Sequence, residues 1–388
     1  MARCAPRWIR VVWPLLAAAA PAAAQEVEGV RVVTFNLWHG RALLGERTEA
    51  TARLLAAARP DLVGLQEVSG SVWRRNRAEV LAERLGYAFV YRPSDGVRVV
   101  FEEGLAALAP RIERSGRRKL VHSRPWPFER RFVQWAETTL PSGQAVVLFN
   151  THLTHHDPHG YQVERLEQAL ELLEVVAHQA LARDLPAVVV GDLNSEPGHL
   201  ALRALTGDLL GEAPLIDAWA AVGQGPGATD SPANPHNDSD EAAARIDYVL
   251  ALRGTTREPV PVAAALFGAE PVDVGGQTVV PSNHYGVQVD FELRPRTPAS
   301  IGAASRGAVG VLTGAAPLTA AAAPATPADR AADLVRRVRA LQDRVRAIRS
   351  AERARLEDAA RREAADDRPV TIDARRLRAQ VLAALLAG

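Results

Sequence analysis

Apolar runs of strand length alternate with amphipathic stretches between residues 29 and 293, without an internal repeat. The pattern predicts ten strands, at 30–35, 62–65, 88–91, 105–109, 132–140, 145–149, 187–190, 246–250, 260–266 and 287–293. It predicts four helices, at 46–59, 71–85, 161–182 and 198–206. Because strands outnumber helices, we expect sheet layers flanked by helices and not a doubly wound parallel sheet.

The helix at 161–182 has the clearest amphipathic pattern. Its apolar residues recur at three- and four-residue steps: Val163, Leu166, Leu170, Leu173, Ala177 and Leu181. Four glutamates, at 164, 167, 171 and 174, take the other side. This spacing predicts one buried face and one polar face.

Polar side chains follow four of the apolar strands. Asn36 follows the strand predicted at 30–35, and Gln66-Glu67 follows the strand at 62–65. Asn150-Thr151-His152 follows the strand at 145–149, and Asp192-Leu193-Asn194 comes after the strand at 187–190. Buried strands that each deliver acid, amide or imidazole groups at the same end place those groups along one edge of the core. The sequence therefore predicts a site at that edge.

Several of these residues have structural alternatives. Asp192 and Asn194 share a face in extended chain and suit phosphoryl transfer, but the same pair also forms Asx turns that cap helices. Glu67 is equally compatible with a metal ligand and with a charge at a helix N-terminus, and Asn36 alone is only a strand-end residue.

Four histidines, at 152, 155, 156 and 159, and Asp157 follow one another closely in the sequence, but their spacing matches no zinc motif. We therefore expect His155, His156 and His159 to be loop residues near the site. Asp247 lies within a predicted strand, where a buried carboxylate needs a partner. His284 can supply one, and an aspartate that orients an imidazole is typical of hydrolytic sites. The alternative is that main-chain groups satisfy both side chains.

Composition divides the chain into four segments. Residues 1–24 combine arginines, an apolar run and the sequence Ala22-Ala23-Ala24, which predicts a cleaved signal peptide and hence an exported protein in the periplasm or outside the cell. The only cysteine, Cys4, lies in this segment, so the mature chain would have no thiol ligand or nucleophile. Residues 25–296 carry 27 basic and 35 acidic side chains, which removes a general electrostatic argument for nucleic-acid binding.

The remaining segments are a linker and a tail. Residues 297–328 are rich in Ala, Pro and Gly, which favours a linker over a membrane span. Residues 329–388 contain 15 arginines and 10 acidic residues, and a helix is predicted over 328–367 with Leu334, Leu341, Val345, Ile348 and Leu356 as an imperfect stripe. We expect a solvated helix or weak self-association through it.

Taken together, seven short motifs resemble the endonuclease/exonuclease/phosphatase superfamily. They are Thr34-Phe35-Asn36, Leu65-Gln66-Glu67, Glu103-Gly104, Asn150-Thr151-His152-Leu153, Gly191-Asp192-Leu193-Asn194, Arg245-Ile246-Asp247-Tyr248 and Ser282-Asn283-His284. They cover about 29–293 in the family's order. The resemblance implies an α/β four-layer sandwich of two mixed β-sheets flanked by helices, here with a helical or disordered C-terminal tail.

The resemblance also implies roles for individual residues. Glu67 would be the principal metal ligand, with Asn36 beside it and Asn283 where the family usually has aspartate. Asp192 would activate the attacking water, and Asn194 would donate to phosphoryl oxygens. His284 would be a catalytic imidazole paired with Asp247. His152 would be the histidine that binds phosphate, with Glu103 or alternatively Glu102 as its carboxylate partner. Oxygen ligands favour Mg²⁺, with Mn²⁺ or Ca²⁺ as alternatives, over zinc.

The implied function is metal-dependent hydrolysis of a phosphoester in nucleic acid, phospholipid or a small phosphodiester, as in nucleases, sphingomyelinases and other phosphodiesterases. Asn283 stands in place of the usual aspartate, and Trp38 stands where some relatives have an acidic residue. Both changes reduce the negative charge around the metal, which predicts weak metal affinity and one dominant ion. The alternative function is a binding protein that kept the fold and lost turnover. Candidate substrate contacts are the basic and aromatic region 117–135, His39 and the loop 223–244.

Overall fold

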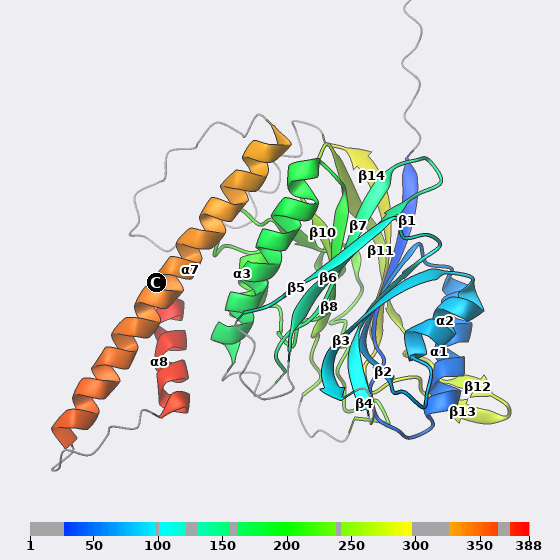
Figure 1. Cartoon of the computed structure of the whole chain (residues 1–388), viewed down its shortest axis with the longest axis horizontal. Helices are drawn as coiled ribbons and strands as arrows, with labels where there is room; N and C mark the ends of the chain where they lie inside the picture. The colour runs from blue at the N-terminus through cyan, green and yellow to red at the C-terminus, as the bar shows by residue number, and fades with distance from the viewer. Residues whose placement is uncertain are drawn as a thin grey trace, which may run out of the picture.

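The computed structural model describes residues 27–97, 101–121, 130–155, 161–237, 242–296, 326–363 and 373–387. Two mixed six-stranded sheets lie face to face with helices on their outer surfaces (Figure 1). This is the expected α/β sandwich, and it is confirmed.

Each sheet has one parallel pair at its centre. The first sheet has the order β11 (Arg257–Phe267), β14 (Gly286–Pro295), β1 (Glu28–Asn36), β2 (Leu62–Gly70), β4 (Phe101–Ala109) and β3 (Ala88–Val97). The second has the order β5 (Arg114–Lys119), β6 (Phe132–Thr139), β7 (Ala145–His152), β8 (Ala187–Asp192), β10 (Asp247–Leu252) and β9 (Leu215–Asp217). Strands β1 and β2, and strands β7 and β8, are parallel, and their neighbours pair antiparallel.

Helical crossovers join the two parallel pairs. Helix α1 (Leu44–Ala58) connects β1 to β2 and packs beside α2 (Arg77–Leu85), whereas α3 (Gln162–Gln179) and the 3-10 turn η1 (Leu181–Arg183) connect β7 to β8. Each crossover makes its own two strands parallel. Hydrogen bonds of Asn36 to Asp192 and of Gln66 to Asn150 join the two sheets, so the carboxyl ends of all four strands meet at one edge of the sandwich. The shorter elements are α4 (Leu200–Thr206), α5 (Ala218–Val222) and the hairpin β12 (Val272–Val274) with β13 (Gln277–Val279).

Three apolar clusters separate the layers. The middle cluster joins the inner faces of the sheets and includes Val32, Leu148 and Val190. A second cluster lies between the first sheet and helices α1 and α2, and the largest lies between the second sheet and α3. The alternation of side chains in β1, with Val32 in the middle cluster and Val33 in the helix-facing one, follows the two-residue period of a strand.

The tail packs against the sandwich. Helix α7 (Pro327–Glu363) contacts α3 and η1, and α8 (Ala374–Ala387) contacts α7 and α3 (Figure 1). Leu334, Val338 and Val345 are buried in the same cluster as the apolar residues of α3. The expectation of a solvated helix is therefore wrong for this face of α7, because its apolar stripe has an intramolecular partner.

Several sequence-based boundaries shift. The helix expected at 71–85 begins at Arg77, because Ser71 and Arg74 form a bridge and Asn76 caps the helix by accepting a hydrogen bond from the Ala78 amide. The tail helix is described to Glu363, and α8 was not expected. The signal peptide at 1–24 and nearly all of the linker lie outside the described residues. No helix in the described ranges is both long enough and apolar enough to cross a bilayer.

Candidate active site

Asp192, Asp247 and His284 form a buried cluster at the edge where the strands end. Asp192 is the last residue of β8 and pairs in register with Asp247, the first residue of β10. Nδ1 of His284 lies 2.9 Å from Oδ2 of Asp247 and 3.9 Å from Oδ2 of Asp192. The ligand atoms of the three side chains lie within 4.8 Å of one another. Sequence reasoning expected the pairing of Asp247 with His284, and the geometry agrees with it.

Burial and proximity shift the protonation equilibria of this cluster. Burial and the charge of Asp247 raise the pKa of Asp192 to about 7. Burial opposes protonation of His284, but the charge and hydrogen bond of Asp247 outweigh it and raise its pKa to about 10. His284 is thus an imidazolium held by a carboxylate.

Asp192 connects these groups to other strand ends. Its Oδ1 accepts the main-chain amide of Asn194 at 3.0 Å, which is an Asx turn, and its Oδ2 accepts Asn36 Nδ2 at 3.0 Å. The side chain of Asn194 donates to the carbonyl of Leu153, and its backbone has a φ of 46°. Asp192 and Asn194 therefore form an Asx turn and also lie in the site, so the two interpretations of this pair are compatible.

His152 ends β7 next to Asp192. Its Nε2 lies 3.4 Å from Asp192 Oδ2 but has no hydrogen bond in the described part of the chain. Burial and the charge of Arg131 hold the pKa of His152 well below its usual range. Oδ1 of Asp247 is likewise buried without a hydrogen-bond partner among the described residues. Unsatisfied buried atoms on two neighbouring groups indicate a place where a ligand or ion completes the contacts.

Glu67 occupies a β-bulge. The pairing of β2 with β4 shifts between Leu65 and Val68, and Glu67 has a φ of 50°. The bulge directs its carboxylate toward Asn36, whose Nδ2 donates to Oε1 at 3.1 Å. Oδ1 of Asn36 accepts the amide of Trp38 instead, so Asn36 presents its nitrogen and not its oxygen to the carboxylates.

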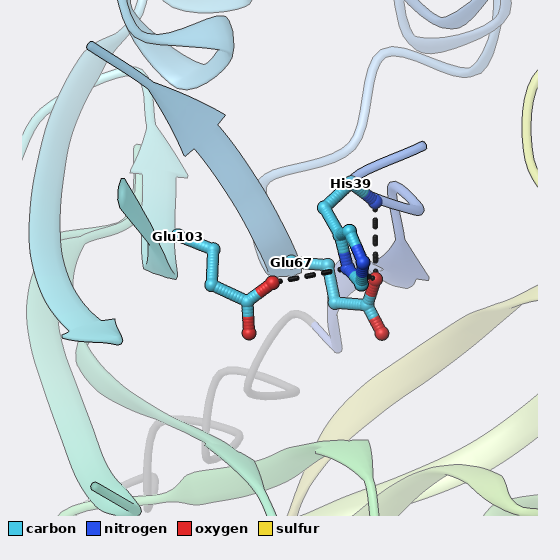
Figure 2. A group of neighbouring side chains, drawn as sticks. All are labelled: His39, Glu67 and Glu103. Atoms are coloured by element: carbon cyan, nitrogen blue, oxygen red, sulfur yellow. Dashed lines mark hydrogen bonds and ion pairs between the residues drawn. The ribbon is translucent and has the colours of Figure 1, made fainter. Parts of the chain in front are cut away.

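His39 lies between two glutamates that come from neighbouring strands (Figure 2). Its Nδ1 is 2.6 Å from Glu67 Oε2 and 3.0 Å from Glu103 Oε2. Hydrogen bonds to Glu103 and Glu67 raise the pKa of His39 to about 10. Burial alone would raise the pKa of Glu67, yet the hydrogen bond from His39 and the positive charges of His39 and His284 hold it well below its usual range.

The placement of Glu103 differs from the sequence-based expectation. It was expected beside His152, with Glu102 as the alternative, but its carboxylate lies on His39. Asn283 is half-buried, and its Oδ1 is 3.5 Å from Ser282 Oγ. Within the described residues no hydrogen bond joins Asn283 to Glu67 or Asp192.

The other expected contacts are distributed differently. In the region 117–135, Arg118 pairs with Glu174, and the Arg117 guanidinium lies over the Phe132 ring. Residues 122–129 lie outside the described residues, as do His156 and His159. Trp38, from the loop after β1, stacks on His236 in the loop 223–244, with ring centroids 4.9 Å apart.

Two buried arginines that the sequence did not single out support the site. Arg47 donates to the carbonyls of Leu37, Trp38, Gly40, Ala42 and Pro281. Arg77 donates to the carbonyls of Leu37 and Trp38 and to Thr48 Oγ1. Together they hold the loop that carries Trp38 and His39. No sequence signal distinguishes these arginines from surface arginines on an amphipathic helix.

A polar contact also joins the sheets beneath the site. Nε2 of Gln66 donates to Oδ1 of Asn150 at 2.7 Å, and Nδ2 of Asn150 donates to carbonyls in β2 and β4. Gln66 and Asn150 are fully buried. These two strand-end amides therefore fix the spacing of the sheets and do not line the surface of the site.

Two groups have the ligand types and spacing for a cation. His39, Glu67 and Glu103 form one, and Asp192, Asp247 and His284 form the other, each with ligand atoms within 4.8 Å of one another. Carboxylates with one imidazole suit a divalent ion with oxygen preference. The carboxylate of Asp192 provides a proton acceptor, and the imidazoles of His152 and His284 beside it can stabilise negative charge, which suits hydrolysis of a charged ester.

Comparisons with known proteins agree with this geometry. The model of the endonuclease/exonuclease/phosphatase family matches residues 33–284. No curated protein matches the sequence. Among solved structures, an endonuclease/exonuclease/phosphatase family protein from Bacteroides thetaiotaomicron is 18% identical, with a TM-score of 0.54, and the match covers 69% of this chain and 96% of that chain.

Two further solved structures have the same fold. A mannosyl-6-phosphatase from Bacteroides thetaiotaomicron is 19% identical with a TM-score of 0.53, covering 68% of this chain and 99% of that one. TDP2 from D. rerio, complexed with a single-strand DNA product, is 21% identical with a TM-score of 0.54, covering 68% and 98%.

Proposed function

Because the chain belongs to the endonuclease/exonuclease/phosphatase family, we propose that it is a divalent-metal-dependent hydrolase of phosphoester bonds. The observation that carries the proposal is the convergence of Asp192, Asp247, His284 and His152 at one edge of the sandwich, beside Glu67. A site for ligand binding alone has no need of a buried carboxylate whose pKa lies near 7 next to a buried imidazolium.

Each residue of the site has a separate role in the proposed hydrolysis. Asp192 accepts a proton from the attacking water, since its pKa of about 7 makes it a base near neutrality. His284, held by Asp247, supplies positive charge to the phosphoryl oxygens as negative charge develops. His152 and the side-chain amide of Asn194 bind further phosphoryl oxygens.

The donor set fits a divalent metal. Glu67 and Glu103 would hold it, and His39 would join them as a ligand once its imidazole had lost its proton. The unsatisfied Oδ1 of Asp247 marks a further carboxylate oxygen without a partner among the described residues. An ion held by these residues would supply positive charge that offsets the negative charge of a bound phosphate. We propose Mg²⁺, with Mn²⁺ or Ca²⁺ as alternatives, because most of the ligand atoms are oxygens.

The direct test is hydrolysis of bis(p-nitrophenyl) phosphate by the full chain with Mg²⁺. We expect turnover that EDTA abolishes, and a loss of about 10²–10⁴-fold in kcat for H284A, the range of a general acid-base or charge-stabilising group. H178A is the matched control, since His178 is exposed in the last turn of α3. Equal rates for wild type and H284A would contradict the assignment, and binding of Mg²⁺ without turnover would favour the non-catalytic alternative.

A second test concerns the number of ions. Asn283 carries no charge where the family usually has aspartate, and Trp38 stands where some relatives have an acidic residue, so we expect a single weak magnesium site in calorimetric titration. The matched variant E67Q should lose most of the heat, while E292Q, on an exposed part of β14, should retain it. Two tight magnesium sites would refute this part of the proposal.

We propose that the protein is exported, on the strength of the arginine-flanked apolar segment at 1–24. Determining the N-terminal residue of protein secreted by the native host tests this directly. A mature N-terminus near Gln25 is expected, and an intact Met1 on protein in the cytosol would contradict export.

A further inference from the structure

A basic pocket opens beside the site, between α1 and α2. It has a volume of about 510 Å³, within the range of ligand-binding pockets. His39 lines it, so the pocket begins at the side chain that bonds Glu67 and Glu103. The imidazole of His39 therefore lies between the pocket and the carboxylates of Glu67 and Glu103.

Arginines dominate the lining of this pocket. Arg41, Arg74, Arg75, Arg77 and Arg84 face a single carboxylate, Glu49. Glu49 pairs with Arg84, and Arg75 pairs with Glu79 and Glu83 outside the pocket. Arg41 and Arg74 are exposed and have no ion pair with any carboxylate in the described ranges. The pocket thus keeps positive charge that the protein does not neutralise.

The wall of the pocket is positive as well. Arg77 is only 3% exposed and has no carboxylate partner among the described residues, and its Nη2 has no hydrogen bond there. Burial lowers the pKa of Arg77 to about 9, which leaves it charged at neutral pH. A buried, unpaired cation is costly to the fold and attracts anions to the cavity that it lines.

Aromatic side chains accompany these charges. Trp73 is 84% exposed, and with Arg74 and Arg75 it separates the pocket from a second hollow, of about 400 Å³, that Phe89 also lines. Glu79 and Glu102 also line the second hollow, so the unneutralised positive charge is concentrated in the first pocket. Guanidinium groups beside the exposed ring of Trp73 favour phosphates and a stacked base, the two components of a single-stranded nucleic acid. A membrane surface is less well matched, because the arginines line concave hollows and not a convex face.

We propose that the pocket between α1 and α2 is a substrate subsite that binds the nucleotides next to the scissile phosphate of a single-stranded oligonucleotide. Arg41 and Arg74 contact a neighbouring phosphate, and Trp73 stacks on a base. The inference rests on the proposed phosphoester hydrolase function and names its substrate class. The acidic domain as a whole does not oppose this, since contacts are local and screened beyond about 10 Å in ordinary buffers.

The test is equilibrium binding of a fluorescein-labelled, phosphorothioate-linked oligothymidylate to the full chain in Mg²⁺, followed by anisotropy at several salt concentrations. W73A should weaken binding about tenfold without changing the salt dependence, and W73F should restore most of the affinity. R74A should weaken binding and reduce the slope of log K against log salt by about 0.7. R294A, an exposed arginine on β14, is the control and should bind like wild type.

A second substrate separates this inference from the proposed function. Bis(p-nitrophenyl) phosphate has a single phosphate, so W73A and R74A should hydrolyse it at the wild-type rate. Wild-type oligonucleotide affinity in both variants would overturn the subsite. If W73A and R74A instead lost binding to phosphatidylserine vesicles and kept wild-type affinity for the oligonucleotide, the surface would be assigned to membranes and the subsite would be overturned. Failure of wild type to hydrolyse the small ester would contradict the hydrolase function, while leaving the binding result interpretable.

Discussion

Arg47 links the loop after β1 to the segment that carries His284. Its guanidinium is fully buried, stacks on Trp38 at 4.2 Å, and donates both to carbonyls of the loop and to the carbonyl of Pro281. Trp38, with a φ of 53°, is in the left-handed region that a tryptophan rarely adopts. The loop therefore depends on external hydrogen bonds for its conformation.

Replacement of Arg47 by lysine should weaken this support. An ammonium cannot reach carbonyls on both sides as the planar guanidinium does, so some buried carbonyls lose their donor. We expect R47K to lower the free energy of unfolding by about 3 kcal/mol in urea denaturation, and to lower kcat because His39 moves with the loop. R53K, on the exposed side of the same helix, should change neither by much. Unchanged stability and activity in R47K would contradict the role given to Arg47.

Gly191 sets the position of Asp192. It has a φ of 148°, and a Cβ built there would lie 2.0 Å from the carbonyl oxygen of Thr151. G191A should therefore destabilise the protein by about 3 kcal/mol or more and displace the carboxylate of Asp192. G198A, where an added Cβ meets no heavy atom within 4 Å, should change stability by about 0.5 kcal/mol or less. Thermal unfolding and hydrolysis rates of the two variants distinguish these outcomes.

The sequence located the strand-end residues of the site better than the residues that contact them. Asn36, Glu67, His152 and Asp192 are recognisable because each follows an apolar strand, and strand direction brings them together. The contact of Glu103 with His39 was not predictable, because it depends on the bulge at Glu67 and on the left-handed turn at Trp38. Arg47 and Arg77 were missed because periodicity does not report a buried cation.

At the scale of elements, the apolar pattern found every central strand and the edge strands β3 and β11 of the first sheet, but it missed β5, β9, β12 and β13. Strand β5 has the sequence RSGRRK, which contains no apolar alternation, and it pairs only along one edge with β6. Strands β12 and β13 have three residues each, too few to show a period. A strand such as β5 depends on an available neighbour more than on its side-chain pattern, so the hydropathy of its own sequence does not reveal it.

In helix α3 the sequence pattern predicts the apolar face correctly but does not show that part of the polar face is buried. Its glutamate face was expected to be polar, yet Glu167 and Glu171 are each 3% exposed. Glu167 pairs with Arg349 of α7, and Glu171 accepts the amide of Val121. The tail thus supplies part of the charge that neutralises this face.

Removing one apolar contact between these helices tests their packing. Leu334 of α7 is 1% exposed in the cluster shared with α3. L334A should lower the free energy of unfolding by about 2–3 kcal/mol, from lost apolar burial and an incompletely filled cavity. R339A, on the exposed side of α7, should stay within about 0.5 kcal/mol of wild type. Similar stabilities for the two variants would mean that α7 is not docked in solution.

For the whole molecule, the tail and the site occupy different layers. The site lies at the strand ends of both sheets, whereas α7 and α8 cover the outer side of α3 (Figure 1). Sequence alone predicted weak self-association through the tail, but Leu334, Val338 and Val345 already have partners within the same chain. The apolar surface that would drive association is thus buried while the tail is docked.

A chain ending at Arg296 separates these possibilities. Without α7 the apolar residues of α3 lose their cover, and an exposed apolar patch of this kind promotes association. We expect light scattering to give a monomer for the full chain and oligomers for the truncated one, with a free energy of unfolding lower by about 3 kcal/mol or more. Hydrolysis of bis(p-nitrophenyl) phosphate per folded molecule should persist, because the strand ends remain in place. An oligomeric full chain that becomes monomeric on truncation would instead support association through the tail.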